Sequence, residues 1–320
     1  MTLESLLKRT MIAWHSVLHV PFLTRKCAPR RHRIPGLRRM ITIMQWAIIV
    51  AILVLSVSET SANPVNAIVV GGSSGMGKAA ALAVLQRGGR IMLVSRSEDK
   101  LLRAKSELKN KVPEADIEIR SCDVSDEEQV VTLANLIDSN VWDSLIVSAA
   151  GMAPHGPMLS LPTSDTRAIM QSKVWTAYYC AKHLSPKLRD KGAVIFVAGI
   201  LNRRPGLNCS PLAMANGALE GLTRSLALEW GPRLRVNCLS PGFCDTERFN
   251  HMDADRKERM LANTAASLPL QRVGQPEDMG EAIFYLLSAT FCTGIVLDVD
   301  GGHGIRQYAN PTTDPMRTTM

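Results

Sequence analysis

Short apolar runs alternate with longer helical patterns along residues 63–306, and neither a low-complexity linker nor an internal repeat interrupts them. The apolar runs predict seven strands, at residues 67–70, 90–94, 117–122, 145–148, 193–197, 236–239 and 294–299. The helical patterns are clearest at residues 78–87, 164–191, 211–230 and 276–288. This alternation predicts one α/β domain, a Rossmann-type doubly wound parallel sheet with helices on both faces.

A glycine-rich turn lies between the first predicted strand and the first predicted helix. Its glycines follow the spacing G-x-x-x-G-x-G, and an alanine-rich helix comes directly after them. Glycines let a pyrophosphate approach the backbone, and the N-terminus of the helix offers free N–H groups. An ordinary tight turn is the alternative, but the flanking strand and helix favour dinucleotide binding. The predicted contact residues are Gly71, Ser73, Ser74, Gly75, Met76 and Gly77.

Polar residues follow the second and third predicted strands. Ser95 and Arg96 come after the second strand, where an acid would bind the 2′-hydroxyl of NAD and an Arg accommodates the 2′-phosphate of NADP. The pair therefore favours NADP over NAD, with a solvated surface Arg as the alternative. Asp123 and Val124 end the third strand beside the expected crevice. Asp123 could instead belong to the turn before a helix that begins with a capping box at Ser125.

Charge is distributed unevenly along the chain. The formal net charge is +8, but residues 1–40 hold nine Lys or Arg and one acid, whereas the remaining residues hold 28 basic and 28 acidic side chains. The folded part therefore gives no basis for a nucleic-acid groove. The seven cysteines include no C-x-x-C pair and no metal-ligand spacing. This pattern favours reduced thiols over a disulfide framework or a metal site.

The N-terminal region consists of a basic arm, residues 1–39, and an apolar segment, residues 40–57. The apolar segment is at the lower length limit for a helix that spans a bilayer. We expect a single membrane anchor, which would hold the domain at 63–306 close to the membrane surface. Two alternatives are open: a leader whose removal leaves the domain in the cytoplasm or mitochondrion, and an upstream extension of no structural importance. The tail at 307–320 is expected to be flexible.

These features together resemble the short-chain dehydrogenase/reductase family over residues 63–306. The glycine spacing, the Asp123–Val124 pair and the segments 235–246, 268–278 and 299–302 match motifs of that family in the same order. The resemblance implies a nicotinamide dinucleotide, an unknown small-molecule substrate, and a homodimer or homotetramer. It also implies further cofactor contacts at Ala150, Gly151, Asn216, Pro241, Gly242 and Thr246.

The catalytic positions depart from the family pattern. Where the family has a Tyr and, four residues later, a Lys, this chain has Leu212 and Asn216, and Gly199 stands in the place of the usual Ser. Leu212 cannot donate the proton that a developing alkoxide needs, and Gly199 cannot bond a substrate oxygen. The family's Asn on the earlier long helix corresponds to Lys173. The resemblance therefore implies cofactor binding more strongly than carbonyl reduction.

Lys173 and Asn216 exchange the residue types that the family carries at these two places, and they are the candidate catalytic residues. We hypothesise that the exchange keeps a Lys–Asn pair beside the nicotinamide ribose; two independent changes in an unused site are the alternative. Other side chains in suitable segments could supply a proton, namely His155, Tyr178, Tyr179, Cys209 and Ser210.

Two functions are compatible with these residues. The first is an NADP(H)-dependent oxidoreductase that acts on an unknown small carbonyl, alcohol or enone substrate with a non-standard proton donor. The alternative is a catalytically inactive NADP-binding pseudoenzyme that acts as a sensor or scaffold. Residues 243–270 resemble a mobile flap, which does not identify a substrate.

Overall fold

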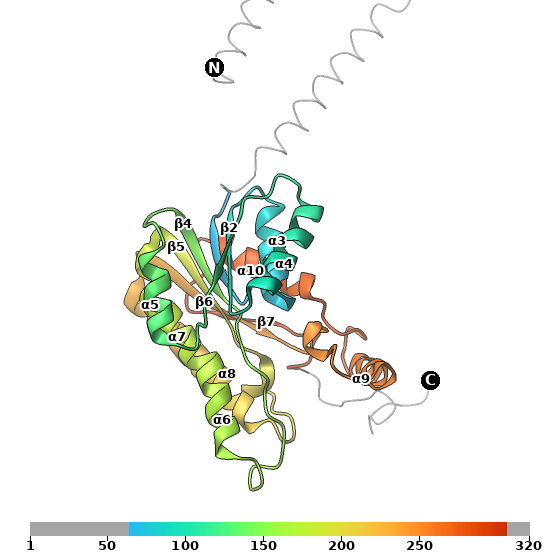
Figure 1. Ribbon diagram of the computed structural model, residues 1–320. Helices are drawn as coiled ribbons and strands as arrows, with labels where there is room; N and C mark the ends of the chain where they lie inside the picture. The colour runs from blue at the N-terminus through green and yellow to red at the C-terminus, as the bar shows by residue number, and fades with distance from the viewer. Residues whose placement is uncertain (1–63, 306–320) are drawn as a thin grey trace, which may run out of the picture. The chain divides into compact units, whose positions relative to one another are not determined.

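The computed structural model describes residues 64–305, which contain one seven-stranded sheet in which every neighbouring pair of strands is parallel (Figure 1). The strand order is β3-β2-β1-β4-β5-β6-β7. The strands are β1 (Ala67–Val70), β2 (Ile91–Ser95), β3 (Ile117–Ser121), β4 (Trp142–Val147), β5 (Leu188–Val197), β6 (Leu234–Pro241) and β7 (Val296–Val299). This order confirms the predicted doubly wound sheet, because the chain starts its second half at β4 on the other side of β1.

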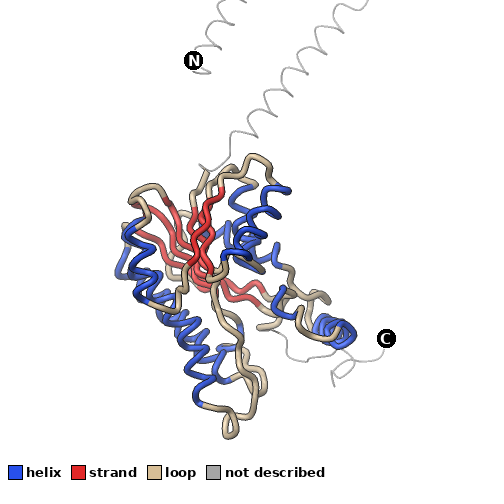
Figure 2. The backbone as a smooth tube through the Cα atoms, viewed as in Figure 1, coloured by secondary structure: helices blue, strands red, loops and turns tan. Residues whose placement is uncertain are grey.

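Helices cover both faces of the sheet, as Figure 2 shows. On one face lie α3 (Gly75–Leu85), α4 (Glu98–Lys111) and α10 (Pro276–Ser288). On the other lie α5 (Glu127–Asn135), α7 (Thr176–Leu184) and α8 (Ser210–Trp230). The predicted helices at 211–230 and 276–288 are confirmed within a residue.

A hydrophobic core lies between each face of the sheet and the helices that cover it. In β1, Ile68 and Val70 enter the core under α5, α7 and α8, whereas Ala67 and Val69 enter the core under α3, α4 and α10. All four side chains are fully buried. Because both faces of the sheet are covered, its central strands read as continuous apolar runs rather than as alternating patterns.

The predicted helix at 164–191 is wrong in its continuity and in its end. It consists of α6 (Thr163–Ile169), a π-helical turn (Met170–Trp175) and α7, and a 3₁₀ turn follows at Ser185–Lys187. Pro186 lies in that 3₁₀ turn and cannot continue the helical hydrogen bonding. Strand β5 therefore begins at Leu188, before the predicted start at residue 193.

The predicted capping box at Ser125 is also wrong. The residue before α5 is Asp126, and its carboxylate accepts the amide hydrogen of Glu128 at 3.0 Å. The hydroxyl of Ser125 instead donates to Asp123 Oδ1 at 2.7 Å. The predicted flap at 243–270 contains a short 3₁₀ turn and α9 (Ala254–Ala266).

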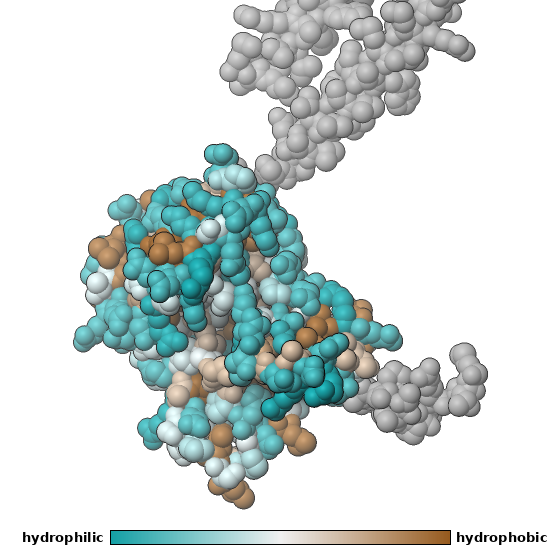
Figure 3. Space-filling model, turned by 45° about the vertical axis from the view of Figure 1, so that its right-hand side comes forward, coloured by the Kyte–Doolittle hydropathy of each residue, from teal (hydrophilic) through white to brown (hydrophobic). Residues whose placement is uncertain are grey.

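The predicted arm (1–39), apolar segment (40–57) and tail (307–320) lie outside the described residues. Within residues 64–305, no helix combines the length and the hydrophobicity needed to cross a bilayer. Figure 3 shows that hydrophobic side chains form small separate patches on the face of the domain that it draws.

Helix α10 packs directly against the backbone of α3, and we predict that Gly280 makes this possible. A Cβ atom at Gly280 would lie 2.6 Å from the carbonyl oxygen of Ala79. Gly280→Ala should therefore lower the free energy of unfolding by about 1–3 kcal/mol in urea denaturation. The matched control is Gly221→Ala in α8, where a Cβ atom meets nothing within 4 Å. The control should stabilise the protein by about 0.5–1 kcal/mol, and equal effects at both positions would contradict the packing argument.

Candidate functional site

The glycine turn between β1 and α3 lies against the end of β4. Gly71 has a φ of +81°, and a Cβ atom there would lie 2.7 Å from the amide nitrogen of Ala149. A Cβ atom on Gly77 would lie 2.3 Å from the carbonyl oxygen of Gly71. Only glycine fits at either position, because each contact is with backbone that cannot move aside. The turn therefore presents backbone rather than side chains to the crevice.

The N-terminus of α3 holds a carboxylate. Ser74 precedes the helix, but its side chain makes no capping hydrogen bond. The amide of Gly75 instead donates to Glu247 Oε2 at 2.7 Å, and Lys78 Nζ lies 2.8 Å from Glu247 Oε1. Burial works against the charged form of Glu247, but the hydrogen bond and charge of Lys78 lower its pKa below the ordinary value. This end of α3 thus binds an anion.

The ends of β2 and β3 bring Arg96 close to Asp123. Burial opposes ionisation of Asp123, but hydrogen bonds from the hydroxyl and amide of Ser125 and the charge of Arg96 lower its pKa. Ser121 at the end of β3 donates to the carbonyl of Arg96 at 3.0 Å, which joins the two strand ends. Ser95 and Val124 lie in the same two segments, as predicted from the sequence.

Lys173, Gly199 and Asn216 meet at the end of β5. Lys173 comes from the π-helical turn and is buried, and its Nζ donates to the carbonyl of Ala198 at 2.8 Å. Gly199 follows directly, and a Cβ atom there would lie 2.9 Å from Asn216 Nδ2. No hydrogen bond joins Lys173 to Asn216 within residues 64–305. Lys173 and Asn216 therefore lie in the same region, as expected, but do not form a hydrogen bond with each other.

Lys173 is a buried cation without a carboxylate partner among the described residues. Burial, and next the charge of Arg248, lower its pKa to about 8. Arg248 lies on the segment after β6, and its guanidinium donates to the carbonyl of Gly151 at 3.3 Å. The amide of Gly151 in turn donates to Ser172 Oγ at 3.1 Å. These contacts join the end of β4, the π-helical turn and the end of β5 around one polar centre.

The last strands supply the remaining predicted contacts. Pro241 ends β6, and the amide of Gly242 donates to the carbonyl of Val299 at 3.0 Å. Thr246 reaches back to the first half of the domain, where its side chain would lie 3.5 Å from a Cβ atom on Gly75. The structure therefore brings predicted residues from β1, β4 and β6 to one edge of the sheet. Their roles in binding stay predictions.

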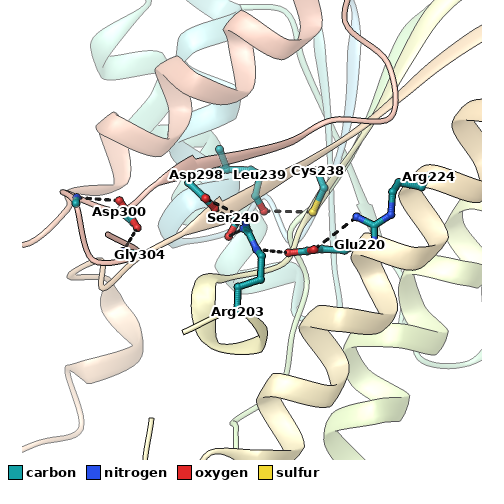
Figure 4. Close-up of polar contacts among 10 residues, drawn as sticks. Arg203, Glu220, Arg224, Cys238, Leu239, Ser240, Asp298, Asp300 and Gly304 are labelled. Carbon is teal, nitrogen blue, oxygen red and sulfur yellow. Dashed lines mark hydrogen bonds and ion pairs between the residues drawn. The ribbon is translucent and has the colours of Figure 1, made fainter. Parts of the chain in front are cut away.

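Arg203 fixes the loop after β5, and no sequence pattern identifies it as a site residue. Figure 4 shows Arg203 between α8 and the ends of β6 and β7. Its guanidinium donates to Glu220 at 3.0 Å, to Ser240 at 2.8 Å and to both oxygens of Asp298. Glu220, whose side chain is only 6% exposed, ties the loop to α8. Ser240 and Asp298 tie it to β6 and β7.

The other candidate proton donors are less well placed. His155 and Tyr178 are exposed, and the ring of Tyr179 packs beside that of Trp175. Cys209 is buried, and burial raises the pKa of its thiol. Among residues 64–305, no cluster of His, Cys, Asp and Glu side chains could hold a metal ion. Lys173 is therefore the titratable group that the fold brings into the centre.

The fold and the glycine turn define a dinucleotide-binding α/β domain. A family model described as enoyl-(acyl carrier protein) reductase matches residues 70–304. Carbonyl reductase family member 4 of Danio rerio is 31% identical over 239 residues, which are 74% of this chain and 96% of that protein. The chain belongs to the short-chain dehydrogenase/reductase family.

Two solved structures share this fold and contain NADPH. A small-chain dehydrogenase in complex with NADPH is 29% identical, with a TM-score of 0.63 over 76% of this chain and 100% of that one. An NADPH-bound short chain oxidoreductase from Pseudomonas aeruginosa PAO1, described as containing an atypical catalytic center, is 27% identical. Its TM-score is 0.68 over 77% of this chain and 98% of that one.

The crevice of this chain fits a nicotinamide dinucleotide. Gly71 and Gly77 carry no side chains of their own that would block a phosphate at the turn. The Glu247 carboxylate shows that the N-terminus of α3 accepts an anion. Asn216 is 1% exposed, and its Oδ1 has no hydrogen-bond partner within residues 64–305, so it can accept one from a bound molecule.

We predict that Lys173 lowers the stability of the domain at neutral pH. Lys173→Met keeps the side-chain volume and removes the unpaired buried charge, so it should raise the free energy of unfolding at pH 7 by about 1–2 kcal/mol. Native Lys173 loses its proton near pH 8, but an unfolded Lys does so near 10.5. The wild type therefore gains stability over this interval, and the advantage of Lys173→Met should shrink.

Urea denaturation between pH 7 and 10.5 checks this prediction. Lys109→Met is the matched control, because Lys109 is exposed in the last turn of α4. The control should change stability little at any pH in this range. A loss of stability in Lys173→Met at pH 7 would show that the ammonium is well compensated.

Proposed function

We propose that this chain is an NADP(H)-dependent oxidoreductase that acts on a small carbonyl, alcohol or enone substrate with Lys173 as a non-standard proton donor. The observation that carries the proposal is the burial of the Lys173 ammonium at the end of β5, beside Gly199 and Asn216. Burial of an unpaired cation is costly, and such groups concentrate at functional sites.

Reduction of a carbonyl needs a hydride, which the bound cofactor supplies, and a proton at the alkoxide oxygen. Leu212 in the usual Tyr place cannot give that proton. Lys173 Nζ can, because its pKa of about 8 keeps it protonated at pH 7 but close to release. Asn216 offers a free Oδ1 acceptor beside it.

The choice of NADP over NAD rests on Arg96. Its guanidinium makes no ion pair with a carboxylate among the described residues, although its charge reaches Asp123. An Arg at the end of β2 suits a 2′-phosphate. NADPH in two related structures supports the same choice.

A catalytically inactive NADP-binding protein is the second candidate. The observation that favours it is the pair Leu212 and Gly199, which replaces two groups that act on the substrate in the family. In this case the polar centre would serve cofactor binding alone, and the protein would act as a sensor or scaffold.

Nucleotide preference tests the role of Arg96. Arg96→Ala should weaken NADPH binding about tenfold and leave NADH binding unchanged, because one charge-assisted contact is lost. Nicotinamide fluorescence of the full chain gives both dissociation constants. Arg103→Ala is the matched control, since Arg103 is an exposed Arg on α4. Equal losses for NADPH and NADH would contradict the assignment.

Turnover separates the two candidate functions. With a panel of small ketones, aldehydes and enones, we expect NADPH oxidation that slows as the pH rises above about 8, where Lys173 loses its proton. Lys173→Met should reduce turnover at least about 100-fold and leave NADPH binding within a few-fold. Binding without any turnover would favour the inactive protein. Absence of binding would exclude both functions.

A further inference from the structure

An internal carboxylate occupies the end of α3 at which the proposed cofactor would place its phosphates. Glu247 lies 172 residues from Gly75 in sequence, yet its Oε2 accepts the Gly75 amide hydrogen at 2.7 Å. Its other oxygen pairs with Lys78. The Ser74 side chain makes no capping hydrogen bond at this helix end, and Glu247 supplies the acceptor for the Gly75 amide.

Glu247 lies on a short segment that spans the crevice. We call residues 246–250 the strap. Within it, Glu247 contacts α3, and Arg248 donates to the carbonyl of Gly151 after β4. The strap therefore contacts both the helix that follows β1 and the segment that follows β4. The Glu247 side chain is 41% exposed. Its contacts with Gly75 and Lys78 can therefore be replaced by contacts with water at a small cost in free energy.

Space lies beside this contact. A cleft of about 350 Å³ opens between the start of α3, the end of α4 and the strap. Both Glu247 and Lys78 line it, together with Glu107 and Asn250. Lys78 pairs with Glu107 at 2.7 Å as well, so it keeps a carboxylate partner when Glu247 leaves. A carboxylate that swings away from α3 thus leaves no buried charge unpaired.

We infer that Glu247 competes with the cofactor phosphates for the N-terminus of α3 and thereby sets cofactor affinity. The inference rests on the proposed function, because it requires a dinucleotide at this turn. Two anions cannot share the Gly75 amide, since a carboxylate and a phosphate repel each other and need the same donor. Binding therefore includes the release of Glu247 from Gly75 and Lys78, and the measured affinity is reduced by the strength of that contact.

Variants of Glu247 test this inference by fluorescence titration of the full chain with NADPH. Glu247→Gln should bind NADPH about three- to tenfold more tightly than the wild type, which corresponds to one helix-terminus contact. Glu247→Asp keeps the charge but shortens the reach to Gly75, so it should also bind more tightly. Glu258→Gln, which neutralises an exposed acid on α9, is the matched control and should bind as the wild type does.

Inorganic pyrophosphate provides a probe without the nicotinamide. By isothermal titration, it should bind Glu247→Gln more tightly than the wild type by a similar factor. Equal or weaker NADPH binding by folded Glu247→Gln and Glu247→Asp would overturn the competition and leave the proposed function intact. Failure of every folded variant and the wild type to bind NADPH would overturn the proposed function and the competition together.

Discussion

The parallel pairing of β1 with β4 is the constraint on which the site depends. The register joins Ala67–Val70 to Ser144–Val147, so the two strands end at the same height. Beyond that point the chain leaves β1 toward α3 and leaves β4 toward Gly151, and the two connections diverge. Because the next strands along the sheet are also parallel, β5 and β6 deliver Ala198 and Gly242 to the same edge. One crevice therefore collects residues from most of the chain.

Charged side chains around this crevice fall into two groups. Arg203 is fully paired, and its partners come from three elements, so it immobilises the loop after β5. Lys173 is more deeply buried, and within residues 64–305 its only hydrogen-bond partner is the carbonyl of Ala198. Ion pairs thus hold the loop after β5 in place, whereas Lys173 in the centre has no carboxylate partner in the part of the chain that the structure describes. Such a contrast is typical of a site where a ligand completes the interactions.

The sequence was a good guide to the sheet because its strands are buried on both faces. The runs at 67–70 and 236–239 needed only their apolar content to be recognised. The π-helical turn that carries Lys173 could not be predicted, because its residues fit an ordinary helical pattern. The placement of Lys173 near Asn216 came from a family resemblance, not from local spacing. The Glu247–Gly75 contact could not be predicted from the sequence, since no local pattern connects residues so distant in the chain.

The burial of Lys173 is also expected to couple ligand binding to folding. Because Lys173 has no carboxylate partner within residues 64–305, we expect its burial to make the domain less stable than its two hydrophobic cores would allow. A bound molecule that places a hydrogen-bond acceptor near Lys173 Nζ would offset the cost of burying the ammonium and would also make its own contacts. Its effect on the melting temperature would then exceed the effect expected from its contact area, because the native state alone receives both gains. The folded fraction of the chain would then rise with the concentration of that molecule.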